Sequence, residues 1–128
     1  MYKNLIPILL ILIISCKENN YKAMVKYGFN RDTILFNNLY QKDSLLSTIF
    51  CKNFSDANIS VLKIELGCGC TKTKLIDSII KPGDSVAIFI KYLPSLNKDS
   101  GQVIKYITVR TNSSPTFLNL VIKGNVVK

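Results

Sequence analysis

The stretch Ser85-Val86-Ala87-Ile88-Phe89-Ile90-Lys91-Tyr92 carries the strongest fold signal in this chain. Its large apolar side chains alternate with a period of two, which places four of them on one face: Val86, Ile88, Ile90 and Tyr92. Lys81-Pro82-Gly83-Asp84 comes directly before it and is typical of a turn, because Pro fixes φ and Gly accepts a positive φ. The stretch is therefore predicted to be a strand with one buried face.

The same alternation recurs on both sides of this strand. Predicted strands cover residues 33–36, 45–52, 59–68, 74–80, 85–92, 103–109 and 118–126, with turn residues at 97–101 and 111–115. About seven short strands with turn signals every 8–12 residues, and no helical period, are typical of an immunoglobulin-like antiparallel β-sandwich. We therefore expect one all-β domain over residues 31–128.

One predicted strand contains a slip in its apolar pattern. Ile59 and Val61 have one parity, whereas Leu62 and Ile64 continue on the other. A β-bulge at Val61-Leu62 would let Ile59, Val61 and Ile64 face the same core. Deleting one residue there is expected to turn the face that carries Cys68 outward and to cost several kcal/mol, since aliphatic side chains would be exposed.

Residues 1–16 look like a bacterial secretory signal that ends in a lipobox. An apolar run over 5–14 leads to Ser15, the small residue that signal peptidase needs before Cys16. The run is about half of the roughly 20 residues that a transmembrane helix needs, and Pro7 lies inside it. We predict a lipoprotein signal peptide over 1–15, a diacylglycerol anchor on Cys16 and a polar tether over 16–30. Lys17 stands where some bacteria place an Asp for inner-membrane retention, so the expected location is the outer membrane, facing the periplasm or the cell surface.

The charge balance says little about the function, whereas the absence of histidine excludes several kinds of catalytic site. The net charge is +9, but the lysines are scattered and do not interleave with aromatic residues, so nucleic acid is not an expected partner. Lys105 falls on the inward parity of its strand, so its ammonium must snorkel at an edge or a local bulge must intervene. With no His, Ser-His and Cys-His nucleophile pairs are excluded.

The acidic residues also lack a catalytic pattern. All eight stand singly, mostly in turns, where Asp commonly hydrogen-bonds its own backbone. Nothing marks two of them as an acid/base pair. The sequence therefore predicts a protein that is not an enzyme, with no cofactor other than the covalent lipid on Cys16.

Three cysteines remain once Cys16 is lipidated: Cys51, Cys68 and Cys70. Gly69 would let the backbone turn, so a Cys68–Cys70 disulfide is conceivable, and Cys51 faces inward where either of the others could reach it. The functional alternatives are a redox couple or a soft-metal clamp. A metal site is disfavoured and none is predicted, because three thiols without His are short of ligands unless Glu65 or Asp77 joins them.

Four Asp-hydroxyl-aliphatic triplets recur along the chain, with the hydroxyls at Thr33, Ser44, Ser78 and Ser85. They are similar to the acceptor triplet of a general O-glycosylation system in some Gram-negative bacteria. The ordinary explanation is that Asp followed by Ser or Thr ends a turn before an apolar strand begins. We favour the ordinary explanation.

Several turn residues fall in an order that is specific in combination. They are Cys68-Gly69-Cys70-Thr71, then Pro82-Gly83-Asp84-Ser85, then Lys105 to Asn112, and a closing Ile122-Lys123-Gly124. This order resembles the bacterial family known as domain of unknown function 1573, over roughly residues 33–127. The resemblance implies an exported immunoglobulin-like sandwich, often a lipoprotein, and assigns no activity. The chain departs from the family pattern at Asn37 and Leu93, among other positions.

The sequence therefore predicts a lipid-anchored envelope protein with a non-catalytic binding or scaffolding role. Strand edges and loops are the expected contact surfaces, because sandwiches of this class usually bind through them. The partner is an unidentified protein or glycan, and the membrane is contacted through the lipid anchor. The alternative function is a thiol-redox module that uses Cys68 and Cys70.

Overall fold

The computed structural model describes residues 26–128, and nine strands are found among them. The strands are β1 (Tyr27–Phe29), β2 (Thr33–Tyr40), β3 (Leu45–Asn53), β4 (Ile59–Leu66), β5 (Thr71–Leu75), β6 (Ile79–Ile80), β7 (Ser85–Tyr92), β8 (Gly101–Thr111) and β9 (Phe117–Val127). One short 3-10 helix, η1 (Pro94–Asn97), joins β7 to β8. No helix within residues 26–128 is long and apolar enough to cross a membrane.

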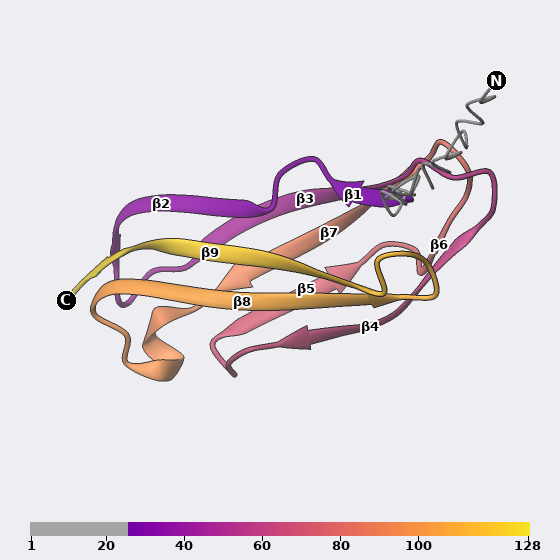
Figure 1. The fold of residues 1–128 in the computed structure, drawn as a ribbon. Helices are drawn as coiled ribbons and strands as arrows, with labels where there is room; N and C mark the ends of the chain where they lie inside the picture. The colour runs from indigo at the N-terminus through magenta and orange to yellow at the C-terminus, as the bar shows by residue number, and fades with distance from the viewer. Residues whose placement is uncertain (1–25) are drawn as a thin grey trace, which may run out of the picture.

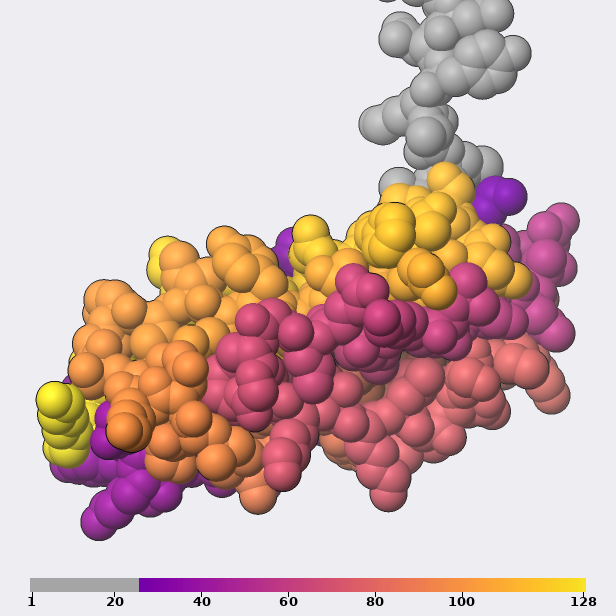
Figure 2. Space-filling view, turned by 90° about the horizontal axis from the view of Figure 1, so that it is seen from below, coloured from indigo at the N-terminus to yellow at the C-terminus, as the bar shows by residue number. Residues whose placement is uncertain are grey.

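The strands form two sheets that pack face to face (Figure 1). The four-stranded sheet has the order β1-β3-β7-β5, and the five-stranded sheet has the order β2-β9-β8-β4-β6. Neighbouring strands are antiparallel except for β2 and β9, which are parallel. Seen from below, β4 lies between β8 and the segment that carries β5 and β6 (Figure 2). The predicted immunoglobulin-like sandwich is confirmed.

The predicted inward faces make the core. On β7, which is central in its sheet, the four alternating side chains are at most 6% exposed. On the faces of β3, β8 and β9 that alternation places inward, Leu45, Ser47 and Leu118 are half-buried. The fully buried residues of these faces are Ile49, Cys51, Val103, Ile107, Val109, Leu120, Ile122 and Val126. The turn before β7 also forms as predicted, with Gly83 at φ +78°. The alternation of apolar side chains in the sequence therefore predicted most of the buried residues.

The N-terminal boundary of the domain differs from the prediction. Tyr27–Phe29 forms β1 and pairs with the end of β3, so the last residues of the expected tether over 16–30 belong to the sandwich. The first predicted strand, 33–36, extends to Tyr40 as β2 and shifts register after Phe36. Gly124 of β9 lies so close to Phe36 that a Cβ there would collide with its backbone oxygen. The signal peptide over 1–15 and Cys16 lie outside the described residues.

The predicted bulge in β4 is confirmed, but its consequence is different. Val61 pairs with Thr111 and Lys63 pairs with Arg110, the next residue along β8, which leaves Leu62 as the extra residue. Deleting Leu62 would therefore leave the pairing of β4 with β8 unchanged on both sides of the deletion. With this register, deleting Leu62 is no longer expected to turn the face that carries Cys68 outward, because the bulge accommodates the extra residue.

The predicted strand over 74–80 was also wrong, because two strands in different sheets cover this region. Thr71–Leu75 (β5) pairs with β7, whereas Ile79–Ile80 (β6) pairs with the start of β4. Asp77 turns the chain between them, since its Oδ1 accepts the N–H of Ile79 at 3.0 Å. An Asx turn of this kind breaks a strand without needing Gly or Pro.

Candidate functional site

Cys68 and Cys70 form a disulfide in the turn between β4 and β5, with their Cα atoms 5.2 Å apart. Cys70 is buried and Cys68 is half-buried. The backbone N–H of Cys70 donates to Cys68 Sγ at 3.2 Å. Of the pairings left open by the sequence, the structure therefore has the short bridge across Gly69.

Cys51 is a free thiol, fully buried in the core. It pairs with Val86, near the start of β7, whereas Thr71 next to the disulfide pairs with Tyr92 at the end of β7. Six residues of strand separate the two positions by roughly 20 Å, far beyond the reach of a disulfide. Burial raises the pKa of the Cys51 thiol to about 11, so it is protonated and unreactive at neutral pH.

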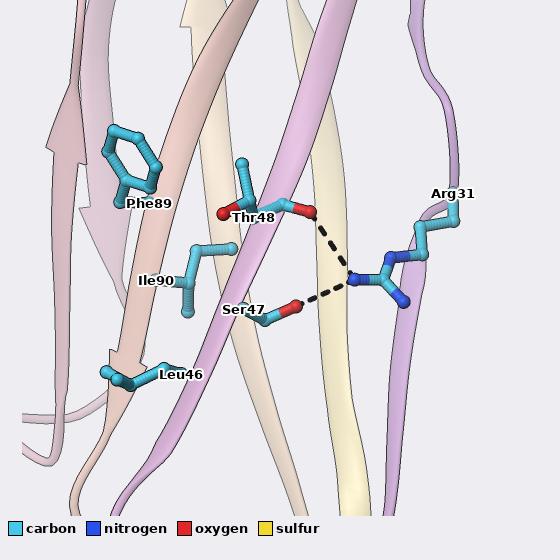
Figure 3. A pocket seen from close by; sticks show the side chains of 6 residues that line it. All are labelled: Arg31, Leu46, Ser47, Thr48, Phe89 and Ile90. Atoms are coloured by element: carbon cyan, nitrogen blue, oxygen red, sulfur yellow. Dashed lines mark hydrogen bonds between the residues drawn. The ribbon is translucent and has the colours of Figure 1, made fainter.

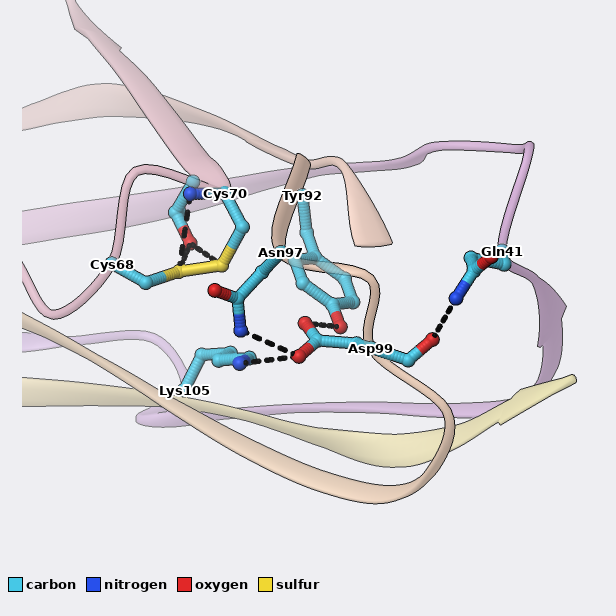
Figure 4. A network of polar contacts seen from close by, with 8 residues as sticks. Gln41, Cys68, Cys70, Tyr92, Asn97, Asp99 and Lys105 are labelled. Carbon is cyan, nitrogen blue, oxygen red and sulfur yellow. Dashed lines mark hydrogen bonds and ion pairs between the residues drawn. A yellow bond between two sulfur atoms is a disulfide. The ribbon is translucent and has the colours of Figure 1, made fainter. Parts of the chain in front are cut away.

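A polar cluster surrounds Asp99 (Figure 4). Its carboxylate accepts hydrogen bonds from Tyr92 Oη at 2.6 Å, Asn97 Nδ2 at 2.8 Å and Lys105 Nζ at 3.0 Å. Gln41 Nε2 donates to the Asp99 backbone oxygen at 2.8 Å. The cluster ties β8 and the β2–β3 turn to the segment that follows β7.

The Asp99–Lys105 ion pair corrects the expectation for Lys105. The β8–β9 register is continuous through this residue, so no bulge intervenes, and the ammonium does not snorkel. The side chains of Lys105 and Asp99 are only 15% and 8% exposed, and each neutralises the other inside the domain. Sequence reading missed Asp99 because it occupies a predicted turn, where Asp is usually exposed.

Electrostatics make Asp99 a structural anion. Burial alone would raise the pKa of its carboxyl, but the hydrogen bonds from Tyr92, Asn97 and Lys105 outweigh it and lower the pKa below the ordinary value. Burial, reinforced by the bond to Asp99, raises the pKa of the Tyr92 phenol. Neither group is prepared to transfer a proton near neutral pH.

The other candidate residues do not converge. Among residues 26–128, no three Cys, Asp or Glu side chains lie close enough together to hold a metal ion. The triplet hydroxyls stand apart: Thr33 begins β2 and donates to Asp32 at 3.0 Å, while Ser44, Ser78 and Ser85 are exposed where β3, β6 and β7 begin. These are the positions at which a turn ends, and their glycosylation remains a prediction.

The feature that sequence reading did not locate is an open edge on β3. β1 pairs only with Cys51–Asn53, so the preceding residues of β3 have a strand neighbour on the β7 side alone. Asn30 exchanges hydrogen bonds with the Phe50 backbone, which shows that Phe50 points its N–H and C=O toward this edge. By alternation, Leu46 and Thr48 point theirs the same way.

Arg31 reaches across this open edge (Figure 3). Its guanidinium donates to Ser47 Oγ at 2.8 Å and to the Thr48 backbone oxygen at 3.4 Å. Beside it lies a hollow of about 530 Å³, whose lining includes Leu46, which is 72% exposed, and Phe89. An exposed edge next to apolar side chains is the arrangement to which an extended segment can add.

Comparison with known families identifies the domain. The family described as "Protein of unknown function (DUF1573)" matches residues 27–126, nearly all of the described chain. The chain belongs to this family. The match begins at β1, in agreement with the structural boundary of the DUF1573 domain.

Solved structures support the fold of this DUF1573 domain. A protein of unknown function from Porphyromonas gingivalis W83 is similar with a TM-score of 0.70 and 13% identity; the match covers 83% of this chain and 51% of that one, so this chain spans about half its length. The PapD-like domain 7 of human CEP192 is similar with a TM-score of 0.60 and 12% identity, and the match covers 81% of this chain and 87% of that one. The periplasmic chaperone SfaE is similar with a TM-score of 0.54 and 4% identity, and the match covers 80% of this chain and 60% of that one. No curated protein matches the chain.

Proposed function

We propose that this chain is a lipid-anchored, non-catalytic binding module of the outer membrane that accepts an extended protein segment along the open edge of β3. The observation that carries the proposal is the outward-directed backbone of Leu46 and Thr48, which has no strand neighbour among residues 26–128. The likeness to PapD-like domains and to a periplasmic chaperone is consistent with a binding role.

The geometry favours strand addition over a loop contact. An added strand would take main-chain hydrogen bonds from Leu46 and Thr48, and alternate side chains would reach Leu46 and Phe89 on the outer surface. Arg31 occupies the edge through one short bond to Ser47 Oγ and one long bond to the Thr48 oxygen. Because Arg31 is exposed, it can swing aside at little cost.

Thr48→Pro is expected to abolish partner binding while leaving the domain folded. Proline removes the N–H that faces the open edge and leaves the bonds to β7 intact, so it is tolerated as edge prolines are. A photo-crosslinking amino acid at position 46, introduced in cells, measures binding as a cross-linked adduct. The adduct should be lost in the Thr48→Pro variant.

The matched control is Thr73→Pro on the opposite edge of the same sheet. The bonds from Leu93 N to Cys70 O and from Ile76 N to Ala87 O show that even-numbered residues here face β7, so the N–H of Thr73 faces outward. Thr73→Pro should keep the adduct. An adduct that survives Thr48→Pro, or that Thr73→Pro removes equally, would contradict binding at the β3 edge.

Cys16→Ala is expected to abolish lipid attachment and signal cleavage. Cys16 alone among the cysteines follows a small residue and an apolar run. Labelling cells with a fatty-acid analogue measures the attachment, with Cys51→Ala as the control that should retain the label. Undiminished label in the Cys16 variant would refute the anchor.

The second candidate is a thiol-redox module, and the observed Cys68–Cys70 bridge favours it. A redox disulfide should open with mild reductant under native conditions, releasing two thiols in addition to the buried Cys51. A structural bridge should resist. Thiol counting in the folded protein before and after reductant therefore separates this candidate from the binding module, for which we expect no new thiols.

A further inference from the structure

The outward side chains of the four-stranded sheet combine apolar residues with lysines. On β3, β7 and β5 the outward positions are Leu46, Thr48, Phe50, Lys52, Ser85, Ala87, Phe89, Lys91, Lys72 and Lys74. None of them is acidic, and four are lysines. We call this surface the cationic face. Leu46, Phe50 and Phe89 are 72%, 47% and 43% exposed.

Three of the four lysines lie near Leu46, the most exposed apolar side chain of this face, whereas Lys52 lies at the other end of β3. Lys72 lies directly opposite Lys91, and Leu46 lies opposite Lys91 on the other side. Lys72, Lys74 and Lys91 line a hollow of about 170 Å³ together with Leu46 and Phe89. Asp77 and Asp84 lie at the other end of this sheet, beside the start of β7, and the exposed Asp43 lies in the turn before β3. None of these three acids takes part in the ion pairs found among the described residues.

Two like charges directly opposite each other on neighbouring strands destabilise a sheet. The Lys72–Lys91 pair has no carboxylate partner among the described residues, since both ion pairs found there involve other lysines. An anion seated between the two ammonium groups would relieve this repulsion. Apolar side chains beside it would favour an anion that also offers hydrocarbon.

We propose that the cationic face docks on an anionic phospholipid surface. Phosphate headgroups complement the lysines, and Leu46 and Phe89 reach the boundary between headgroups and acyl chains, as the apolar side chains of interfacial segments do. Leu46 and Phe89 also flank the open edge of β3, so docking on the membrane and strand addition would compete for these two side chains. The proposal does not depend on the lipid anchor or on strand addition, because it concerns the folded domain itself.

The chain contains no tryptophan, so one introduced tryptophan reports its own environment. The test uses the chain from residue 16 with Cys16→Ser, so that no lipid is attached, and vesicles of phosphatidylcholine with or without phosphatidylglycerol. Leu46→Trp should shift its emission to the blue and resist aqueous quencher only with phosphatidylglycerol. Leu35→Trp is the matched control, because Leu35 is 74% exposed on the other sheet and should not change.

Charge variants test the headgroup contact. Lys72→Ala with Lys91→Ala should weaken sedimentation with anionic vesicles about thirtyfold, since each lysine near such a surface contributes about fivefold. Lys63→Ala with Lys123→Ala removes the same charge from the other sheet and should change binding less than about threefold, an estimate that follows from the short range of the surface field.

Three outcomes would overturn the proposal. The first is that both pairs of lysine substitutions weaken vesicle binding equally. The second is that the emission of the Leu35→Trp variant shifts as much as that of the Leu46→Trp variant. The third is that polyglutamate binds the cationic face and the anionic vesicles do not.

Discussion

Replacing Asp99 by alanine is expected to lower the free energy of unfolding by about 3–5 kcal/mol, because it leaves a buried ammonium without its partner. Lys105 Nζ has Asp99 as its ion-pair partner at 3.0 Å, and the Tyr92 hydroxyl also loses its acceptor. Urea unfolding at neutral pH measures the loss. Asp56→Ala removes an exposed acid and should stay within about 0.5 kcal/mol of the parent.

A second substitution shows whether the loss comes from the uncompensated charge. Adding Lys105→Met to Asp99→Ala removes the stranded ammonium and keeps an apolar side chain of similar length, so about half of the lost stability should return. If the double variant is no more stable than Asp99→Ala, the cost lies in the lost hydrogen bonds to Tyr92 and Asn97 and not in the charge.

The same carboxylate gives the stability a pH dependence of known sign. The pKa of Asp99 is lowered in the folded state, so at acidic pH the unfolded chain binds more protons than the folded one. Its contribution is complete above the ordinary Asp pKa of about 3.9 and is lost as the pH falls through the lower folded-state pKa. The Asp99→Ala/Lys105→Met variant should therefore lose less stability than the parent between neutral and acidic pH.

Deleting Phe89 is expected to destabilise the domain by about 3–6 kcal/mol, whereas deleting Leu62 should cost about 1 kcal/mol or less. Both are exposed apolar residues, at 43% and 54%. Phe89 lies in the central strand, whose register is regular on both sides, so its loss turns two buried side chains outward. Leu62 is the extra residue of the bulge, and its loss leaves Val61 and Lys63 on their present partners.

Urea unfolding of the two deletion variants measures this contrast. Similar destabilisation by both would show that the bulge contributes stability of its own, through the bend it gives β4. Near-parental stability of the Phe89 deletion would show that β7 tolerates a register slip, which the continuous pairing with β3 and β5 argues against.

Local signals in the sequence predicted much of this fold correctly. Alternation located the inward faces of β3, β7, β8 and β9, and the parity slip in β4 located its bulge. Elements too short to show a period of two were not predicted correctly. Tyr27–Phe29 has only three residues, too few to show a period of two, and residues 74–80 were read as one strand because both parts are short.

The candidate site divides in the same way. The sequence determined which cysteines could form a disulfide and which side chains face inward. It also showed that Lys105 carries a charge on an inward position. These properties depend on residue type and on the period of the strand. Only the tertiary structure decided that Cys68 bonds to Cys70, that Asp99 neutralises Lys105, and that β3 has an open edge beside a cationic face. Those facts depend on strand order and on which strand ends meet, and such contacts join residues whose separation along the chain carries no periodic signal.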